Sequence, residues 1–309
     1  MTLLPRGATP LSPPRRLPAA KPDHRHQNGD GPMSTLMTRV GEGAGTGGVV
    51  TAGPGHRAGS PPGDGAALRV TLRDAPMIFM YHAVADAAED PNQLAVSPAR
   101  FAEQMAWLSR SGLRGVSMAE LVAAMAAGQA RGLVGLTFDD GYTSVLDTAL
   151  PVLDRHGFGA TAFIISDRMG GTNEWDEGPV WPLLDAGGVR ELAAAGVEIG
   201  SHSATHPHLA GVAARRQAAE VTASRGRLED LLSAPVPGFA YPYGSMDEAA
   251  RYAVGSAGYQ YACAVETPLA HLGPLALPRI YIGQRDSVAR MTVKRRLHKG
   301  YVAIKGRGK

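Results

Sequence analysis

The stretch Leu133-Val134-Gly135-Leu136-Thr137-Phe138-Asp139-Asp140-Gly141 places two adjacent acids directly after an apolar run. Residues 133–138 have the length of a short buried strand, and the glycine after the acids is typical of a strand-to-turn junction. Two ionised carboxylates side by side at the edge of a core are unfavourable unless a cation or a proton is present. Two interpretations are open at this point: a solvated turn, or a site where one acid binds a metal and the other transfers a proton.

Strands and helices are predicted to alternate around this stretch. Apolar runs predict strands at residues 77–81, 133–138, 160–165, 197–200, 239–241, 261–265 and 277–282. Amphipathic segments predict helices between them, including one continuous helix over residues 144–156 and a long helix over 213–232. The alternation is typical of a parallel sheet in an α/β fold, either open or closed into a barrel. In both cases functional side chains gather at the carboxyl ends of the strands.

Helix starts are predicted from their capping residues. Ser97 followed by Pro98 marks one helix start, and Ser117 with Glu120 forms a capping box for the next helix. A second capping box is predicted from Ser245 and Glu248, and Asp286 is predicted to cap the last helix.

The composition restricts the class of protein. The chain has 309 residues, of which 44% are hydrophobic, enough for one large core or two modest ones. Its net charge is +3, and part of the basic excess lies in residues 294–309, where aromatic residues are scarce, so we predict no nucleic-acid partner. The single cysteine, Cys263, excludes an intrachain disulfide, and its apolar neighbours indicate a buried thiol.

The chain is predicted to contain one folded domain after a long extension. Residues 1–70 are rich in Gly, Pro, Ala, Arg and His without an apolar period, which predicts disorder. The folded domain is predicted at 76–300, with its motifs in 133–283, followed by a basic tail at 301–309. Because no apolar run could span a membrane and no secretory signal is visible, we predict a cytoplasmic protein without membrane insertion. The oligomeric state stays open.

A second polar segment, Ser201-His202-Ser203-Ala204-Thr205-His206-Pro207, follows another predicted strand. On a helix or a tight turn, the four-residue spacing places both imidazoles on one face, a common arrangement for binding a divalent cation. Taken alone, the pair fits two structural histidines better than a metal site. One aspartate with two histidines would leave coordination positions open, as in catalytic rather than structural metal sites.

A third segment, Phe239-Ala240-Tyr241-Pro242-Tyr243-Gly244, ends a further predicted strand. Proline and glycine constrain the backbone there, so that an N–H group could point at an oxyanion; an ordinary strand exit is the alternative interpretation.

Together the three segments resemble the polysaccharide deacetylase family with the NodB homology domain (carbohydrate esterase family 4). Its motif TFDDG is matched at 137–141 and its motif H-[ST]-x-x-H at 202–206, whereas R-x-P-[YF]-G is matched only in part at 240–244. The resemblance covers about residues 76–297 and implies a distorted (β/α)7-type barrel. It also implies a metal-dependent hydrolase that removes N-acetyl groups from a sugar in a polysaccharide or glycoconjugate. The alternatives are hydrolysis of a small non-sugar amide or imide, and a non-catalytic carbohydrate-binding relative.

The resemblance also implies roles for individual residues. It assigns a divalent metal, Zn²⁺, to Asp140, His202 and His206. It assigns the general base to Asp139, and it assigns the N–H that contacts the tetrahedral intermediate to Tyr243.

The segment 77–82 resembles the first strand of the exopolysaccharide de-N-acetylase subgroup, in which His82 would be the general acid. A polar strand terminus is the alternative interpretation of His82.

One position departs from the family pattern, because Ala240 replaces the arginine of the third motif. We predict that Arg279, in the strand 277–282, supplies this cation from a neighbouring strand; a surface arginine is the alternative. Trp175 and Trp181 flank a loop rich in Gly, Asn and Asp, and are predicted to stack on a sugar ring or, equally, to pack within the protein.

Overall fold

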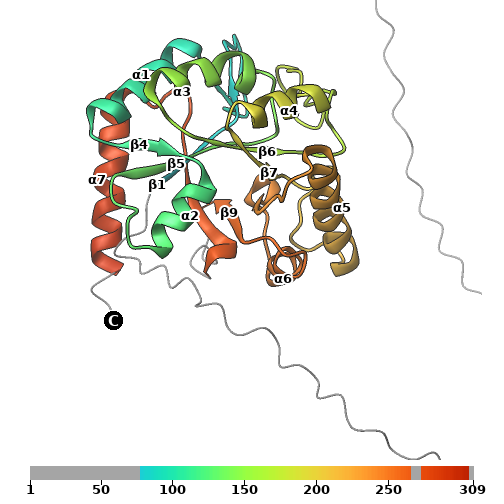
Figure 1. Cartoon of the computed structure of the whole chain (residues 1–309). Helices are drawn as coiled ribbons and strands as arrows, with labels where there is room; N and C mark the ends of the chain where they lie inside the picture. Colours follow the sequence, from blue (N-terminus) through green and yellow to red (C-terminus); the bar gives the residue numbers. More distant parts are fainter. Residues whose placement is uncertain (1–76, 266–272, 306–309) are drawn as a thin grey trace, which may run out of the picture. The chain divides into compact units, whose positions relative to one another are not determined.

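The strands of the protein form a closed parallel barrel (Figure 1). The computed structural model describes residues 77–265 and 273–305, and seven strands of this part pair in a ring. In spatial order the ring consists of β1 (Met77–Tyr81), β10 (Leu277–Tyr281), β9 (Tyr261–Val265), β8 (Gly238–Ala240), β7 (Glu198–Ser201), β6 (Thr161–Ile164) and β5 (Leu133–Phe138). The ring closes where Met77–Tyr81 pairs in register with residues 134–138. The barrel predicted from the family resemblance is confirmed.

One edge of β5 is shared by two strands, which distorts the barrel. β4 (Arg114–Val116) pairs with the start of β5 at residues 133–135, and β6 pairs with its end at Thr137 and Phe138. β4 was not predicted, because Arg-Gly-Val is too short to show a strand period. Two further short strands, β2 (Ala83–Val84) and β3 (Ala95–Val96), form a separate pair.

Helices surround the barrel in the order expected from the alternation (Figure 1). They are α1 (Pro98–Arg110), α2 (Met118–Ala126), α3 (Leu150–His156), α4 (Ala186–Ala194), α5 (Ala214–Leu232), α6 (Glu248–Ser256) and α7 (Val288–Lys305), with 3₁₀ turns η3 (Pro242–Gly244) and η4 (Pro274–Ala276). The predicted extension at 1–70 lies outside the described residues. Within the predicted basic tail at 301–309, residues 301–305 continue α7, and residues 306–309 are outside the described part.

The predicted helix 144–156 is interrupted at its start. Residues 145–149 form a π-helical turn, η2 (Val145–Ala149), and regular α3 follows. Pro151 explains the wider turn, because it has no amide hydrogen and its ring clashes with the carbonyl four residues earlier.

Two of the predicted helix caps are confirmed and two are wrong. The hydroxyl groups of Ser97 and Ser117 accept bonds from the backbone three residues later, as predicted. α6 is capped instead by Asp247, which accepts from the Ala250 N–H, while the Ser245 hydroxyl accepts from Ala210. Asp286 lies two residues before α7, where it accepts the Gly283 N–H and forms an ion pair with Lys294.

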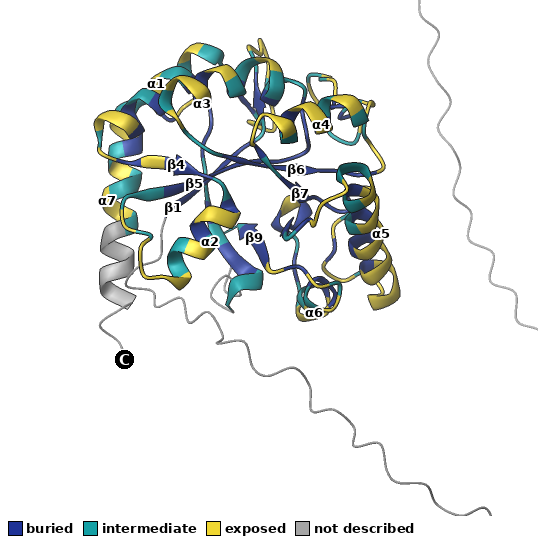
Figure 2. Ribbon diagram, viewed as in Figure 1, coloured by how far each residue is buried: buried dark blue, intermediate teal, exposed yellow. Residues whose placement is uncertain are grey.

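The core has an inner and an outer part. Because successive strand residues face opposite sides, Ile78 points into the barrel with Phe163 and Cys263, whereas Phe79 packs outward under the helices. Met118 and Leu121 of α2 belong to the inner cluster, so α2 covers one end of the barrel. The strands are accordingly buried and the helices are exposed on their outer faces (Figure 2). Cys263 is buried, as predicted, and burial raises the pKa of its thiol to about 12.

No helix of the described part is both long and apolar enough to cross a bilayer.

Candidate functional site

The polar residues of the three motifs meet at the carboxyl ends of the strands. Asp139 and Asp140 directly follow β5, His202 directly follows β7, and Tyr243 lies in η3 after β8. This is the end of a parallel barrel where loops from different strands converge. The structure therefore brings together residues that are more than a hundred positions apart in the chain.

Asp140, His202 and His206 form a candidate cation site. The Asp140 Oδ1 atom lies 3.4 Å from Nε2 of His202 and 3.3 Å from Nε2 of His206. The potential ligand atoms of all three residues lie within 4.8 Å of one another, and all three residues are buried. Asp140 Oδ1 is a buried oxygen without a hydrogen-bond partner in the described part of the chain. A carboxylate oxygen that faces two imidazole nitrogens is a ligand set that fits a divalent cation such as Zn²⁺.

Hydrogen bonds fix the imidazole of His202 and the backbone of His206. His202 Nδ1 donates to the carbonyl oxygen of Ala240 at 2.8 Å, so Nδ1 carries the proton and Nε2 presents its lone pair to the site. Ala240, which lacks the arginine side chain of the family motif, thus contributes through its backbone. The His206 N–H donates to the Ser203 hydroxyl at 3.0 Å, so the histidine pair lies on a turn and not on a helix.

The backbone of the site is strained. In the described part of the chain, six non-glycine residues have a positive φ, and four of them are Asp140 (72°), Ser203 (66°), His206 (67°) and Tyr243 (56°). Left-handed backbone is unfavourable for residues with a Cβ, and it persists where the surrounding structure enforces it. Its concentration here indicates that the fold fixes these side chains at some cost in stability.

Arg279 forms a bidentate ion pair with Asp139 inside the barrel. Its two terminal nitrogens lie 2.6 Å and 2.7 Å from Oδ1 and Oδ2 of Asp139, and both side chains are almost fully buried. The guanidinium also donates to Thr137 Oγ1 at 3.1 Å and lies 5.6 Å from the ring centroid of Phe163. Arg279 is therefore not a surface residue, and a cation stands beside Asp139 although position 240 is alanine.

Thr137 was not assigned a role from the sequence. Its hydroxyl donates to the Phe79 carbonyl at 2.9 Å while accepting from Arg279, so it fixes the guanidinium against the neighbouring strand. Its place in the first motif was the only signal, and a threonine in a strand does not by itself indicate such a bond.

The two adjacent acids have opposite pKa shifts. Burial raises the pKa of Asp139, but the charge and hydrogen bonds of Arg279, together with the nearby His202 and His82, outweigh burial and hold that pKa well below its usual range. Burial and the neighbouring Asp139 charge raise the pKa of Asp140 well above its usual range. The negative charge of Asp139 is therefore compensated by Arg279, whereas a negative charge on Asp140 has no such partner, which favours binding of a cation at Asp140.

The imidazoles near the two acids are neutral at pH 7. Burial is the main cause of the lowered pKa of both His202 and His206, so both can present lone pairs. His82, directly after β1, is also within electrostatic range of Asp139 and Arg279, and burial lowers its pKa to about 4. Its Nδ1 atom is buried without a hydrogen-bond partner among the described residues.

Aromatic rings surround His206. The ring centroids of Trp175 and Tyr243 lie 5.1 Å and 4.5 Å from that of His206, and the Tyr243 ring stacks on His208 at 4.0 Å. Tyr243 is 43% exposed, so its ring lies at the mouth of the site. Trp181 packs instead edge-on against buried Tyr142 at 5.7 Å. Of the two tryptophans, only Trp175 contacts a residue of the candidate cation site.

Trp175 is presented by a hairpin that was expected only as a loop. Thr172 bridges to Pro182, and Tyr142 bridges to Leu183, so the hairpin is fixed to the segment after the first motif. Asp176, next to Trp175, contributes to the raised pKa values of Asp140 and Tyr243 and was not singled out from the sequence.

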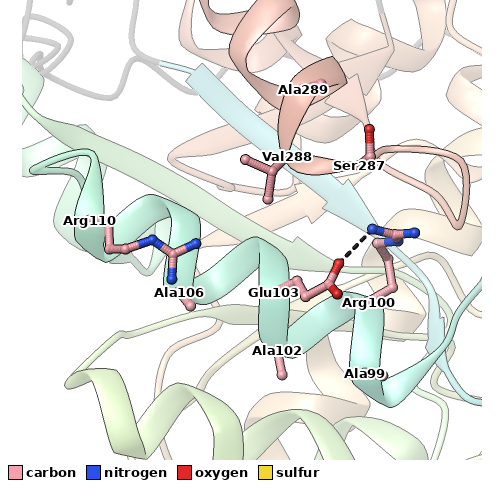
Figure 3. A pocket seen from close by; sticks show the side chains of 9 residues that line it. All are labelled: Ala99, Arg100, Ala102, Glu103, Ala106, Arg110, Ser287, Val288 and Ala289. Atoms are coloured by element: carbon pink, nitrogen blue, oxygen red, sulfur yellow. Dashed lines mark hydrogen bonds and ion pairs between the residues drawn. The ribbon is translucent and has the colours of Figure 1, made fainter.

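A surface groove lies between α1 and the start of α7 (Figure 3). Arg100 and Glu103 form an ion pair on its wall. The groove contains none of the candidate site residues, and it is lined by Ala99, Arg100, Ala102, Glu103, Ala106, Arg110, Ser287, Val288 and Ala289.

Comparison with known proteins identifies the family. Residues 127–262 match the family model of polysaccharide deacetylases. The Bacillus subtilis protein YxkH, named as a candidate polysaccharide deacetylase, is 28% identical over 209 residues, which cover 66% of this chain and 70% of YxkH. The match assigns residues 127–262 to the polysaccharide deacetylase family, a family of hydrolases that act on non-peptide carbon–nitrogen bonds, as predicted from the motifs.

Solved structures share the same fold. A polysaccharide deacetylase from Bacillus cereus, BC0361, is 25% identical with a TM-score of 0.59, covering 70% of this chain and 67% of its own. The Streptococcus pyogenes deacetylase PplD is 24% identical with a TM-score of 0.61, covering 71% of this chain and 96% of its own. The family match lies inside the predicted domain 76–300, and the ends of that domain stay predictions.

Proposed function

We propose that this protein removes N-acetyl groups from amino sugars of a polysaccharide or glycoconjugate, with Zn²⁺ held by Asp140, His202 and His206. The observation that carries the proposal is the unpartnered, buried Asp140 oxygen, which faces both imidazole Nε2 atoms. A bound zinc ion would act as a Lewis acid toward the acetyl carbonyl and the attacking water.

In this proposal Asp139 is the general base. Arg279 keeps its carboxylate ionised and fixes its orientation through two hydrogen bonds, so the carboxylate is ready to take a proton from the attacking water. The low pKa of Asp139 also means that it releases that proton readily to a more basic group.

His82 is proposed to deliver a proton to the leaving amine, which departs poorly as an anion. Because its pKa is about 4, His82 is neutral in the free protein at pH 7, and it can act as an acid only after accepting a proton. Asp139 is the adjacent group whose pKa is lower still, so we infer that the proton taken from water passes on toward His82.

Two further groups complete the proposed site. The Tyr243 backbone N–H, held in a left-handed turn, is proposed to donate to the oxyanion of the tetrahedral intermediate. Trp175 is proposed to stack on a sugar ring beside His206. Trp181 has a packing contact with Tyr142 and is not included in the proposal.

Acetate release from N-acetylated sugar oligomers tests the function. We expect release by the wild type, loss of release with a chelator, and loss in Asp139→Asn. Asp147→Asn, which changes an exposed acid of η2, is the matched control and should keep full activity. Release that is unaffected by both the chelator and Asp139→Asn would overturn the proposal, and release from small non-sugar amides alone would replace its substrate class.

A further inference from the structure

α5 presents a row of buried polar side chains to the segment that carries the two site histidines. Gln217, Glu220 and Ser224 are spaced by three and four residues, so they lie on one face of the helix, and they are 0%, 8% and 0% exposed. This face is the buried side of α5, whereas its outer side is exposed (Figure 2). Buried polar groups on a helix face need partners, and each of the three side chains has at least one partner in the segment 201–209.

The contacts follow the segment in order. The hydroxyls of Ser224 and Ser201 are 2.7 Å apart. Farther along, Gln217 Nε2 donates to the Leu209 carbonyl at 2.8 Å. The helix thus binds the polypeptide before His202 and again after His206.

Glu220 makes the central contact of this row. Its Oε2 accepts the Thr205 N–H at 2.9 Å, and its Oε1 accepts the Thr205 hydroxyl at 2.7 Å. Among the residues that the structure describes, Glu220 forms no ion pair, so both of its oxygens serve Thr205. Thr205 immediately precedes His206, whose backbone is left-handed.

We propose that Glu220 is a positioning residue for the cation site: by binding both the backbone and the side chain of Thr205, it holds His206 in the strained conformation that directs its imidazole at Asp140. The inference rests on the proposed metal centre. Groups that orient metal ligands without touching the metal commonly change metal affinity about 10- to 100-fold when removed.

Zn²⁺ affinity of the full chain tests the inference, measured by competition with a chromophoric chelator. We expect Glu220→Ala to weaken Zn²⁺ binding by about 10- to 100-fold, and Glu220→Gln, which keeps one acceptor oxygen, to weaken it less. Glu229→Gln is the matched control, because Glu229 lies on the same helix and also accepts a backbone N–H, that of Val236, away from the site. We expect this control to bind Zn²⁺ like the wild type.

Urea unfolding of the metal-free proteins shows whether each variant is folded in the binding assay. If Glu220→Ala does not fold, Thr205→Val replaces it, since it removes one of the two bonds at an exposed position and should also weaken Zn²⁺ binding. The Co²⁺ absorption spectrum should change in the Glu220 variants and not in Glu229→Gln. The positioning role is overturned, and the metal centre is not, if the wild type binds Zn²⁺ and the Glu220 and Thr205 variants match its affinity and spectrum. A wild type that binds no Zn²⁺ overturns the metal centre itself.

Discussion

Arg279→Met is the substitution that most directly tests how Asp139 is kept ionised. The two side chains are 1% and 3% exposed and joined by bonds of 2.6 Å and 2.7 Å. At a separation of about 4 Å between charges, the attraction is about 4 kcal/mol for an effective dielectric constant of about 20. Removing one partner of a buried pair costs about 3–5 kcal/mol, because the other charge stays buried without compensation. We therefore expect the free energy of unfolding of the metal-free protein to fall by about this amount at neutral pH.

The loss of stability in Arg279→Met should depend on pH, because the substitution changes the folded-state pKa of Asp139. In the wild type Arg279 holds the folded-state pKa of Asp139 below its unfolded value of about 3.9. This contribution to stability is complete above the unfolded-state pKa and is lost as the pH falls through the lower folded-state pKa. Without Arg279, burial raises the folded-state pKa above the unfolded value, so ionisation at higher pH opposes folding. The difference between wild type and variant should grow with pH above about 4, by up to about 1.4 kcal/mol per pH unit.

Urea unfolding across this pH range, in the presence of a chelator, measures the effect. The double variant Arg279→Met/Asp139→Asn is the matched control, because it removes both charges and should recover much of the stability. In the activity assay, we expect the turnover number of Arg279→Met for acetate release to fall at least about 100-fold, since the base is no longer ionised and oriented. Wild-type stability of Arg279→Met at neutral pH, or wild-type turnover, would refute the reasoning.

Four other predictions concern separate parts of the molecule. Dialysis against a chelator should abolish acetate release and added Zn²⁺ should restore it, whereas His206→Ala should not recover at the Zn²⁺ concentration that saturates the wild type. Trp175→Ala should raise the KM for sugar oligomers about 5- to 10-fold with little change in turnover, as expected for a lost stacking contact of about 1 kcal/mol; an unchanged KM would leave Trp175 a packing residue. Asp247→Ala should lower the free energy of unfolding by about 1–2 kcal/mol in urea, because Asp247 caps α6 and also accepts the Gly211 N–H; stability within error of the wild type would contradict this. Gly244→Ala should lower the melting temperature, because φ is 65° and the added Cβ would lie 2.2 Å from Val265 Cγ2, with an expected cost of about 1–3 kcal/mol.

The parts of the fold predicted from sequence are those with strong local patterns. The apolar runs of β5 and β9 have the lengths seen in the structure, and the Ser97 and Ser117 caps are formed as predicted. β4 and η2 were missed, because a three-residue strand has no measurable period and a proline within a helical pattern does not say how the turn before it adapts.

The cap of α6 was predicted at the wrong residue because two nearby side chains are equally suited to cap a helix. Ser245 and Asp247 are both good cap residues, and the choice depends on Ala210 and Gly211, whose N–H groups lie more than thirty positions away. The local sequence does not indicate which backbone N–H group each of these two side chains accepts.

The candidate site shows the same division between local and long-range information. The motifs placed Asp140, His202 and His206 at strand ends, and the structure brings them together. The partnership of Arg279 with Asp139 was expected only through the family pattern, since it joins residues 140 positions apart and depends on barrel register. Glu220 carried no signal, because a glutamate in a polar helix is ordinarily solvated, and only the tertiary structure shows it buried.

The pairing of β1 with both β5 and β10 determines how late in synthesis the barrel can close. β1 and β5 leave the ribosome early and close together, whereas β10 is the last strand of the barrel, about two hundred residues after β1. Arg279 lies on β10, so Asp139 has no counter-ion until the ring closes. A nascent or truncated chain that ends before β10 would contain all three motifs and the histidines His82, His202 and His206, yet Asp139 would lack its counter-ion. Closure of the barrel and formation of the Arg279–Asp139 ion pair are therefore one and the same step of folding.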